Sequence, residues 1–430
     1  MSVAASHRVE PLNALIFDPA RTGALDQLIA PPYDLIDRTQ QEELHARSPF
    51  NIVRLELSRE ADPYAGAATT LARWRGDAIL TRAPKPAFYY YIQRFAHAGR
   101  AMVRKGVIAR VFLEEFASGK ILPHERTFPK AKEDRLRLLA TTRTNISPIF
   151  GLYPSMSTSL TDLLARVADR APILTAVDDR GIVNELRAID VPDEIAIVQE
   201  ALEAPRILIA DGHHRYETAL EYSRQRRAGV KTSAPQPFDY VMMTLVAFDD
   251  PGLVILPTHR LIRNLPQEPL THFRMRCGED FIIEEVADRD HFLATLAAGE
   301  PDALGAALAG QSGFLLLALR DRGQLAGAMP ETPPAVRSLG VSILHGLILE
   351  RIFGIKPAEV RQGGNIEYTI HAFAALSEVA GGRAAGAFLM NPPTVQDIER
   401  VSRAGSTMPE KSTYFFPKLT TGMVLNPLDD

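Results

Sequence analysis

Residues 206–227 read RILIADGHHRYETALEYSRQRR, and this stretch decides the fold class. Arg206–Ala210 is a short apolar run, which predicts a buried strand. Asp211–Arg215 is polar and contains one glycine, which predicts a tight turn. Tyr216–Arg227 has the length and composition of a helix. Strand, polar turn and helix in this order predict an α/β unit.

Strands and helices are predicted to alternate along the rest of the chain. Thr39–Ala46 predicts a helix, and the alternation of Asn51–Leu57 predicts a strand. Ile173–Asp178 and Gly181–Leu186 predict a hairpin. Val341–Ile352 carries apolar residues on one helical face. We therefore expect an α/β (mixed α+β) chain, with mixed sheets and flanking helices.

The chain has 430 residues, which suggests two or three domains. Changes in pattern divide it into an N-terminal α/β region (1–115), a central phosphate-binding region (116–265) and a C-terminal α/β region with a ligand-facing tail (266–430). The hydrophobic content of 46% and the charged content of 23% are ordinary for globular proteins.

Charge, cysteine content and the lengths of the apolar runs disfavour several classes of protein. A net charge of -4 disfavours nucleic-acid binding, which needs a basic surface. One cysteine, Cys277, cannot form an internal disulfide, which favours a reducing cytoplasm. The N-terminus does not read as a signal peptide, and no apolar run approaches ~20 residues, so we expect no membrane span. The sequence leaves homo-oligomerisation open.

The Asp211–Arg215 turn is the strongest candidate site. A glycine lets the backbone approach a ligand closely, and a helix N-terminus attracts anions. Arg215 offers a planar fork that suits phosphate oxygens. His213 and His214 can donate to phosphate or move a proton near neutral pH. The phosphate-binding candidates here are Asp211, Gly212, His213, His214 and Arg215.

Asp211 is also the candidate ligand for Mg²⁺, directly or through water. The alternative interpretation is that Asp211 only caps the following helix. A transition-metal site at His213 and His214 is disfavoured, because adjacent histidines rarely face one ion and a structural zinc site wants four ligands.

The segment around His124–Thr127 is the second candidate. Glu125 suits a general base, and Lys130 and Arg135 carry charge that suits phosphate. The alternative interpretation is a solvated, charged helix start.

A third group of residues would contact the substrate or close over it. Residues 410–418 combine lysines, hydroxyls and aromatic rings between prolines, and residues 31–34 form a proline-rich loop. An ordered surface tail is the alternative interpretation. The candidate substrate or lid residues are Tyr33, Asp34, Lys411, Ser412, Thr413 and Lys418.

These segments together resemble the bacterial and archaeal domain-of-unknown-function family numbered 1015. The motifs that carry the resemblance are PPYD (31–34), HERT (124–127), ADGHHRYETA (210–219), PTHR (257–260) and MPEKSTYFFPK (408–418). They run through nearly the whole chain. The family name carries no activity with it.

The DGHHR turn also resembles the phosphate-binding turn of the ParB/sulfiredoxin superfamily, which includes free-serine kinases that use ADP or ATP. In those kinases a glutamate after a strand and a proline acts as the base, so the resemblance gives that role to Glu125, after Pro123. Sulfiredoxin chemistry needs a cysteine in the turn, which has none. A ParB-like role needs a helix-turn-helix module and a basic face, and neither is found.

The leading hypothesis from the sequence is a small-molecule kinase with free L-serine as acceptor. ATP or ADP would donate the phosphoryl group with Mg²⁺ bridging it, and Glu125, His213 and His214 would be the catalytic residues. The partners would be a nucleotide and a small hydroxyl substrate. Two alternatives stay open: a nucleotide-binding regulatory protein without turnover, and a phosphoserine-type phosphomonoesterase.

Overall fold

The structure is a computed structural model that describes residues 7–125, 129–154, 157–265, 267–356, 359 and 365–429. The described residues form two compact units. Unit 1 is drawn from residues 1–123, 127–254 and 417–430, and unit 2 from residues 124–126 and 255–416. The division into three regions at 115 and 265 stays a prediction about domain boundaries.

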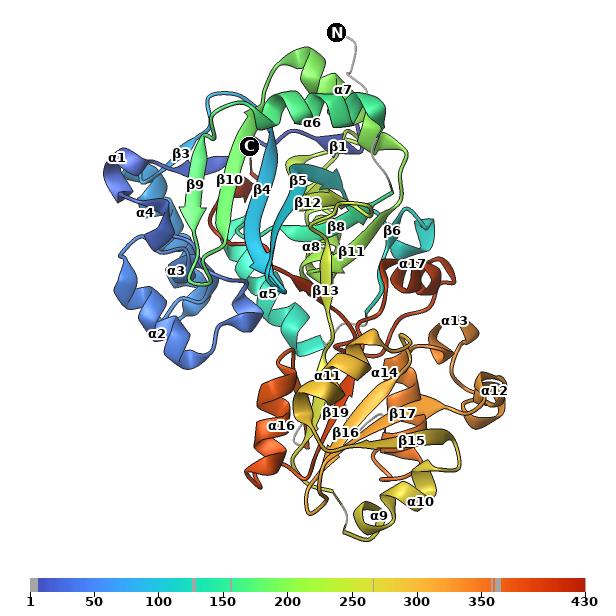
Figure 1. Cartoon of the computed structure of the whole chain (residues 1–430). Helices are drawn as coiled ribbons and strands as arrows, with labels where there is room; N and C mark the ends of the chain where they lie inside the picture. Colours follow the sequence, from blue (N-terminus) through green and yellow to red (C-terminus); the bar gives the residue numbers. More distant parts are fainter. Residues whose placement is uncertain are drawn as a thin grey trace. The chain divides into compact units, whose positions relative to one another are not determined.

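Unit 1 contains a nine-stranded sheet (Figure 1). Eight strands follow the order β6-β11-β8-β12-β5-β4-β10-β9, and β1 pairs with β5. Their bounds are β1 Val9–Glu10, β4 Phe88–His97, β5 Arg100–Phe112, β6 Ile121–Leu122, β8 Ile149–Tyr153, β9 Leu174–Val177, β10 Val183–Ile189, β11 Ile207–Asp211 and β12 Tyr240–Ala247.

The pairing within this sheet is mixed, as predicted. β11 runs parallel to β6, and β12 runs parallel to β8, whereas the other pairs are antiparallel. The predicted hairpin is confirmed as β9 and β10. The predicted strand 206–210 is β11, and Asp211 is the last residue of this strand.

Three helices cover one face of the sheet with an apolar cluster. They are α6 (Thr158–Ala168), α7 (Pro192–Glu203) and α8 (His213–Arg227). Tyr216, Ala219 and Tyr222 of α8 pack in the same cluster as Ile207 and Ile209 of β11. Because side chains alternate along a strand, the intervening positions face the opposite side.

The remaining elements of unit 1 come from its N-terminal part and its last residues. The helices are α1 Pro19–Thr22, α2 Arg38–Arg47, α3 Val53–Glu56, α4 Pro63–Gly76 and α5 Pro129–Thr142, and the short helical turns are η1 Leu25–Gln27, η2 Tyr33–Leu35, η3 Phe116–Ser118 and η4 Pro237–Asp239. β2 (Leu15–Phe17) pairs with β3 (Leu80–Arg82), and β7 (Thr144–Asn145) pairs with β21 (Asn426–Pro427).

The predicted strand at Asn51–Leu57 is wrong: Val53–Glu56 forms the helical turn α3. The Asn51 side chain accepts from the N–H of Val53 at 3.0 Å, and its amide donates to the carbonyls of Gln27 and Ile29. An asparagine that bonds to the backbone two residues on starts a turn and competes with strand pairing. The alternation is too short to override it.

Unit 2 contains a six-stranded antiparallel sheet in the order β15-β17-β16-β19-β14-β18. The strands are β14 His259–Ile262, β15 Phe281–Val286, β16 Leu304–Leu308, β17 Phe314–Leu319, β18 Ile366–Thr369 and β19 Gly386–Met390, and outside the sheet lie β13 Val254–Leu256 and β20 Tyr414–Phe416. Its helices are α9 Gln267–Thr271, α10 Phe273–Cys277, α11 Arg289–Ala298, η5 Arg322–Gln324, α12 Leu325–Ala328, α13 Pro334–Arg337, α14 Gly340–Ile343, η6 Leu344–Glu350, α16 Ala372–Ala380 and α17 Val395–Arg403.

The predicted helix at Val341–Ile352 corresponds to α14 followed by η6, and η6 is a π-helix. A π-helical segment widens the turn and is often found at functional sites. Among the described residues, no helix has the length and apolar content that a membrane crossing requires.

Candidate functional site

The turn between β11 and α8 depends on the backbone conformation of Gly212. Gly212 has φ 94°, a left-handed conformation that favours glycine. A Cβ at this position would lie 3.0 Å from the guanidinium of Arg215. Gly212 is also the N-cap of α8, and no side chain caps the helix. Asp211 therefore does not act as the cap, and the positive end of α8 keeps its capacity for an anion.

Asp211 is held between two cations. Its Oδ1 accepts from Lys418 Nζ at 2.5 Å, and its Oδ2 accepts from Arg215 Nη2 at 2.9 Å. Burial opposes ionisation, but Lys418 and then Arg215 hold the pKa of Asp211 well below its usual range. One carboxylate thus faces two cationic side chains and a helix N-terminus, which leaves positive charge in excess.

Arg215 is fixed by its other donors. Its Nη1 donates to the carbonyl of Pro148 at 2.6 Å, while its Nε is buried and has no hydrogen-bond partner among the described residues. His213 and His214 form the first turn of α8, where His213 is buried and His214 half-buried. His213 also helps to lower the pKa of Asp211.

Arg104 of β5 belongs to the same site, and the sequence analysis missed it. It is only 1% exposed, and it forms no ion pair with a carboxylate among the described residues. Its Nε donates to Gln93 Oε1 at 3.1 Å, its Nη2 donates to the carbonyl of Pro417 at 2.5 Å, and its guanidinium lies 4.7 Å from the ring centre of Phe150. Burial lowers the pKa of Arg104 to about 10.

Arg104 and Gln93 anchor the segment that carries Lys418. Arg104 binds the carbonyl of Pro417, and Gln93 Nε2 donates to the carbonyl of Lys418 at 3.4 Å. Both neighbouring peptide groups are therefore held by buried side chains of β4 and β5, so that Lys418 reaches Asp211, 207 residues away in sequence. The available signal was an arginine inside a strand that also carries Val103, Val107 and Ile108.

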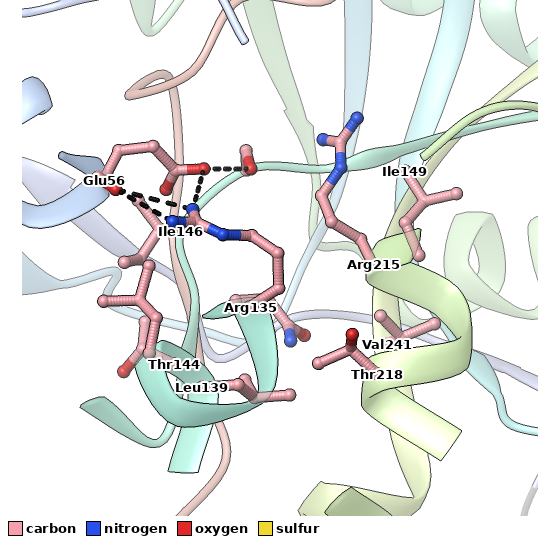
Figure 2. A pocket seen from close by; sticks show the side chains of 12 residues that line it. Glu56, Arg135, Leu139, Thr144, Ile146, Ile149, Arg215, Thr218 and Val241 are labelled. Carbon is pink, nitrogen blue, oxygen red and sulfur yellow. Dashed lines mark hydrogen bonds and ion pairs between the residues drawn. The ribbon is translucent and has the colours of Figure 1, made fainter. Parts of the chain in front are cut away.

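A pocket lies beside Arg215, lined by residues of α3, α5 and α8 and by the segment that leads into β8 (Figure 2). Arg135 of α5 approaches Glu56, and Ser147 donates to Glu56 Oε1 at 3.1 Å. The ring of Tyr33 lies 4.2 Å from the guanidinium of Arg135. Burial raises the pKa of Tyr33 to about 12, against the opposing charges of Arg215 and Arg135.

The structure thus brings together several of the predicted residues in unit 1. Arg135 lines the pocket beside Arg215 and lies over the ring of Tyr33, whereas Asp34 is exposed. Glu56 and Ser147 were not predicted: Glu56 was assigned to a strand, and a lone serine gives no signal. The side chain of Lys130 lies outside the described residues.

The other predicted residues meet in unit 2. Glu125 Oε1 accepts from the backbone N–H of Lys411 at 3.1 Å, and the His124 ring lies 2.9 Å from the hydroxyl of Thr413. Ser412 donates to the carbonyl of Pro409. The predicted site residues therefore fall into two groups, one in each unit.

No group of three or more potential metal ligands of the His, Cys, Asp or Glu types occurs in the part of the chain that the structure describes. Both oxygens of Asp211 already accept from cations. An Mg²⁺ ion at Asp211 stays a prediction, and the ion would compete with Lys418 and Arg215 for the two oxygens.

The chain matches a known protein family. A family model described as "Protein of unknown function (DUF1015)" matches residues 9–342. A comparison with curated proteins gives no match.

Solved structures that resemble the chain do so distantly. A free serine kinase in complex with AMP is 14% identical, with 71% of this chain and 86% of that chain covered and a TM-score of 0.35. A conserved hypothetical protein from Pyrococcus furiosus is 13% identical over 72% and 92%, with a TM-score of 0.34. SbnI with C-terminal truncation from Staphylococcus aureus is 12% identical over 75% and 90%, with a TM-score of 0.35.

Proposed function

The chain belongs to the DUF1015 family, and we propose that it is a small-molecule kinase that transfers a phosphoryl group from a nucleotide to a hydroxyl. Free L-serine is the proposed acceptor, and ATP or ADP the proposed donor. The observation that carries the proposal is the excess of positive charge around Asp211, at the uncapped start of α8.

In phosphoryl transfer, the protein mainly positions the two substrates and neutralises the charge of the phosphoryl group. Arg215 would bind phosphate oxygens with its planar fork, and Lys418 would supply a second positive charge. The first N–H groups of α8 and the rings of His213 and His214 would supply further donors. An incoming phosphate would compete with Asp211 for its two cationic partners.

Glu125 is the proposed base, and this role comes from the resemblance of the segment after Pro123 to the serine kinases. Lys411, Ser412 and Thr413 are proposed to contact the acceptor. The Glu125→Gln variant keeps an oxygen that can accept from the N–H of Lys411. We therefore expect it to bind nucleotide as the wild type does and to lose most turnover, which calorimetry and product analysis would measure separately. Retained turnover would remove Glu125 from the mechanism.

The proposal is tested by incubating the protein with L-serine, Mg²⁺ and ATP, ADP or CTP in turn, with O-phosphoserine detected by mass spectrometry. We expect product with one donor and none with Arg215→Ala. Arg224→Ala is the matched control, because Arg224 lies on the same helix but pairs at the surface with Glu115 and Glu221.

Other outcomes would point to the alternatives. Nucleotide binding without product from any acceptor would favour the regulatory protein. Release of phosphate from O-phosphoserine without nucleotide would favour the phosphomonoesterase.

A further inference from the structure

Unit 2 contains a cleft that the proposed kinase chemistry does not use. Its volume of about 670 Å³ is within the range of small-molecule sites. Met329, Val336 and Met408 are buried residues that line it. The helical segment formed by α14 and η6 supplies polar residues to the same cleft.

Ser342 is the first polar group in the cleft. Its side chain is 95% buried, since the residue is 5% exposed, and its hydroxyl has no hydrogen-bond partner among the described residues. A buried hydroxyl without a partner costs stability, so its presence in a cleft suggests that a ligand supplies the missing bond.

His345 is the second polar group, one helical turn after Ser342 and within the π-helix η6. Arg260 Nε donates to His345 Nε2 at 3.3 Å. Burial, and then Arg260, lower the pKa of His345 to about 3, so the ring is neutral. A neutral imidazole that accepts at Nε2 carries its proton on Nδ1, which makes it a donor.

Arg260 places a buried positive charge behind this donor. It is fully buried, and its Nη1 and Nη2 donate to the carbonyls of Thr258 and Glu410. No ion pair joins Arg260 to a carboxylate in the part of the chain that the structure describes. A hydroxyl and an imidazole N–H close to a buried cation suit an anionic acceptor such as a carboxylate.

Most of the charged residues that line the cleft are acidic. Glu331 and Glu350 are exposed residues that line it, and Glu410 is half-buried there. Arg351 also lines the cleft, but its guanidinium is already paired with Asp280. The cleft therefore combines hydrogen-bond donors next to a buried cation, a group of carboxylates, and apolar side chains.

We propose that this cleft binds a small zwitterion of the amino-acid class with an apolar side chain. Its carboxylate accepts from Ser342 and His345, its ammonium lies among the glutamates, and its side chain packs on Met329 and Met408. The residues of this cleft belong to unit 2 and those of the Asp211–Arg215 turn to unit 1, and the inference does not depend on the proposed kinase activity.

The test is isothermal titration calorimetry of the full chain with three probes: L-leucine, N-acetyl-L-leucine and L-leucinamide. The second probe lacks the ammonium and the third lacks the carboxylate. We expect L-leucine to bind, and each derivative to bind at least about tenfold more weakly. Acetylation removes the positive charge that the glutamates attract, and amidation removes the negative charge that Arg260 attracts.

Ser342→Ala and Ser402→Ala are a matched pair of variants. Both hydroxyls are buried without a hydrogen-bond partner in the described residues of unit 2, but only Ser342 lines the cleft. We expect both variants to be at least as stable as the wild type by scanning calorimetry, and only Ser342→Ala to lose L-leucine affinity. No L-leucine binding, equal binding of either derivative, or unchanged affinity in Ser342→Ala would overturn the proposal.

Discussion

Replacement of Asp211 by asparagine tests the charge balance of the turn. The Asp211 side chain is 19% exposed and accepts from Lys418 and Arg215 through separate oxygens. Asparagine keeps one acceptor oxygen but removes the negative charge. Lys418 and Arg215 then face each other and the positive end of α8 without a counter-charge.

The expected cost can be worked from these contacts. Removing one partner of a buried ion pair costs roughly 3–5 kcal/mol, and the retained oxygen puts Asp211→Asn at the lower end, about 3 kcal/mol. The folded-state pKa of Asp211 lies below its unfolded value of about 3.9, so its contribution is fully present above that pH. The difference between wild type and variant should be constant from about pH 8 to 5 and shrink as the pH falls below about 4.

The assay is urea unfolding at pH 7 followed by tryptophan fluorescence. Trp74 is the only tryptophan in the sequence and is 1% exposed in unit 1, so its emission reports that unit alone. Inorganic phosphate should restore part of the lost stability, because it replaces the missing anion, whereas chloride at equal ionic strength should not. A variant as stable as the wild type, or one insensitive to phosphate, would refute the charge argument.

Two further variants test the geometry of the site. Gly212→Ala introduces a Cβ at φ 94° that lies 3.0 Å from the Arg215 guanidinium. Nucleotide affinity measured by calorimetry should therefore fall about tenfold or more. The control is Gly229→Ala, just beyond the other end of α8, where a Cβ would make an ordinary contact, and this variant should bind nucleotide as the wild type does. Arg104→Met should free the peptide groups around Lys418 and weaken nucleotide binding. Because Arg104 acts through Lys418, the double variant Arg104→Met/Lys418→Met should bind nucleotide no more weakly than Lys418→Met alone.

The local order of strand, turn and helix could be predicted from the sequence because it is encoded in consecutive residues. Arg206–Ala210 is apolar, the glycine follows at once, and the helix is long enough to be distinct. The hairpin that became β9 and β10 was predictable for the same reason, since a turn signal separates two short runs. The strand prediction for Asn51–Leu57 was wrong because a run of seven residues is too short to distinguish a strand from a helix by its pattern. The hydrogen bonds from the Asn51 side chain to the carbonyls of Gln27 and Ile29 favour the helical turn.

The composition of the site was only partly predictable. Motif residues indicate a role but not which residues contact one another. The sequence predicted Glu125 and Lys411 as site residues together with Arg215, and the structure adds that Glu125 and Lys411 contact each other within unit 2. Arg104 was missed because its importance comes from its burial and from its bonds to residues 11 and 313 positions away. Such long-range contacts leave little trace in a single sequence.

The most direct test of the central claim, that the Asp211–Arg215 turn and Lys418 form a phosphate site, is calorimetric titration of ATP and ADP into Lys418→Met. Lys120→Met is the matched control, because Lys120 is a lysine of the same unit whose side chain is 60% exposed. We predict that Lys418→Met lowers the affinity at least about tenfold, or about 1.4 kcal/mol, and that Lys120→Met leaves it unchanged. Equal affinities for wild type and Lys418→Met, or no binding of either nucleotide to the wild type, would contradict the account.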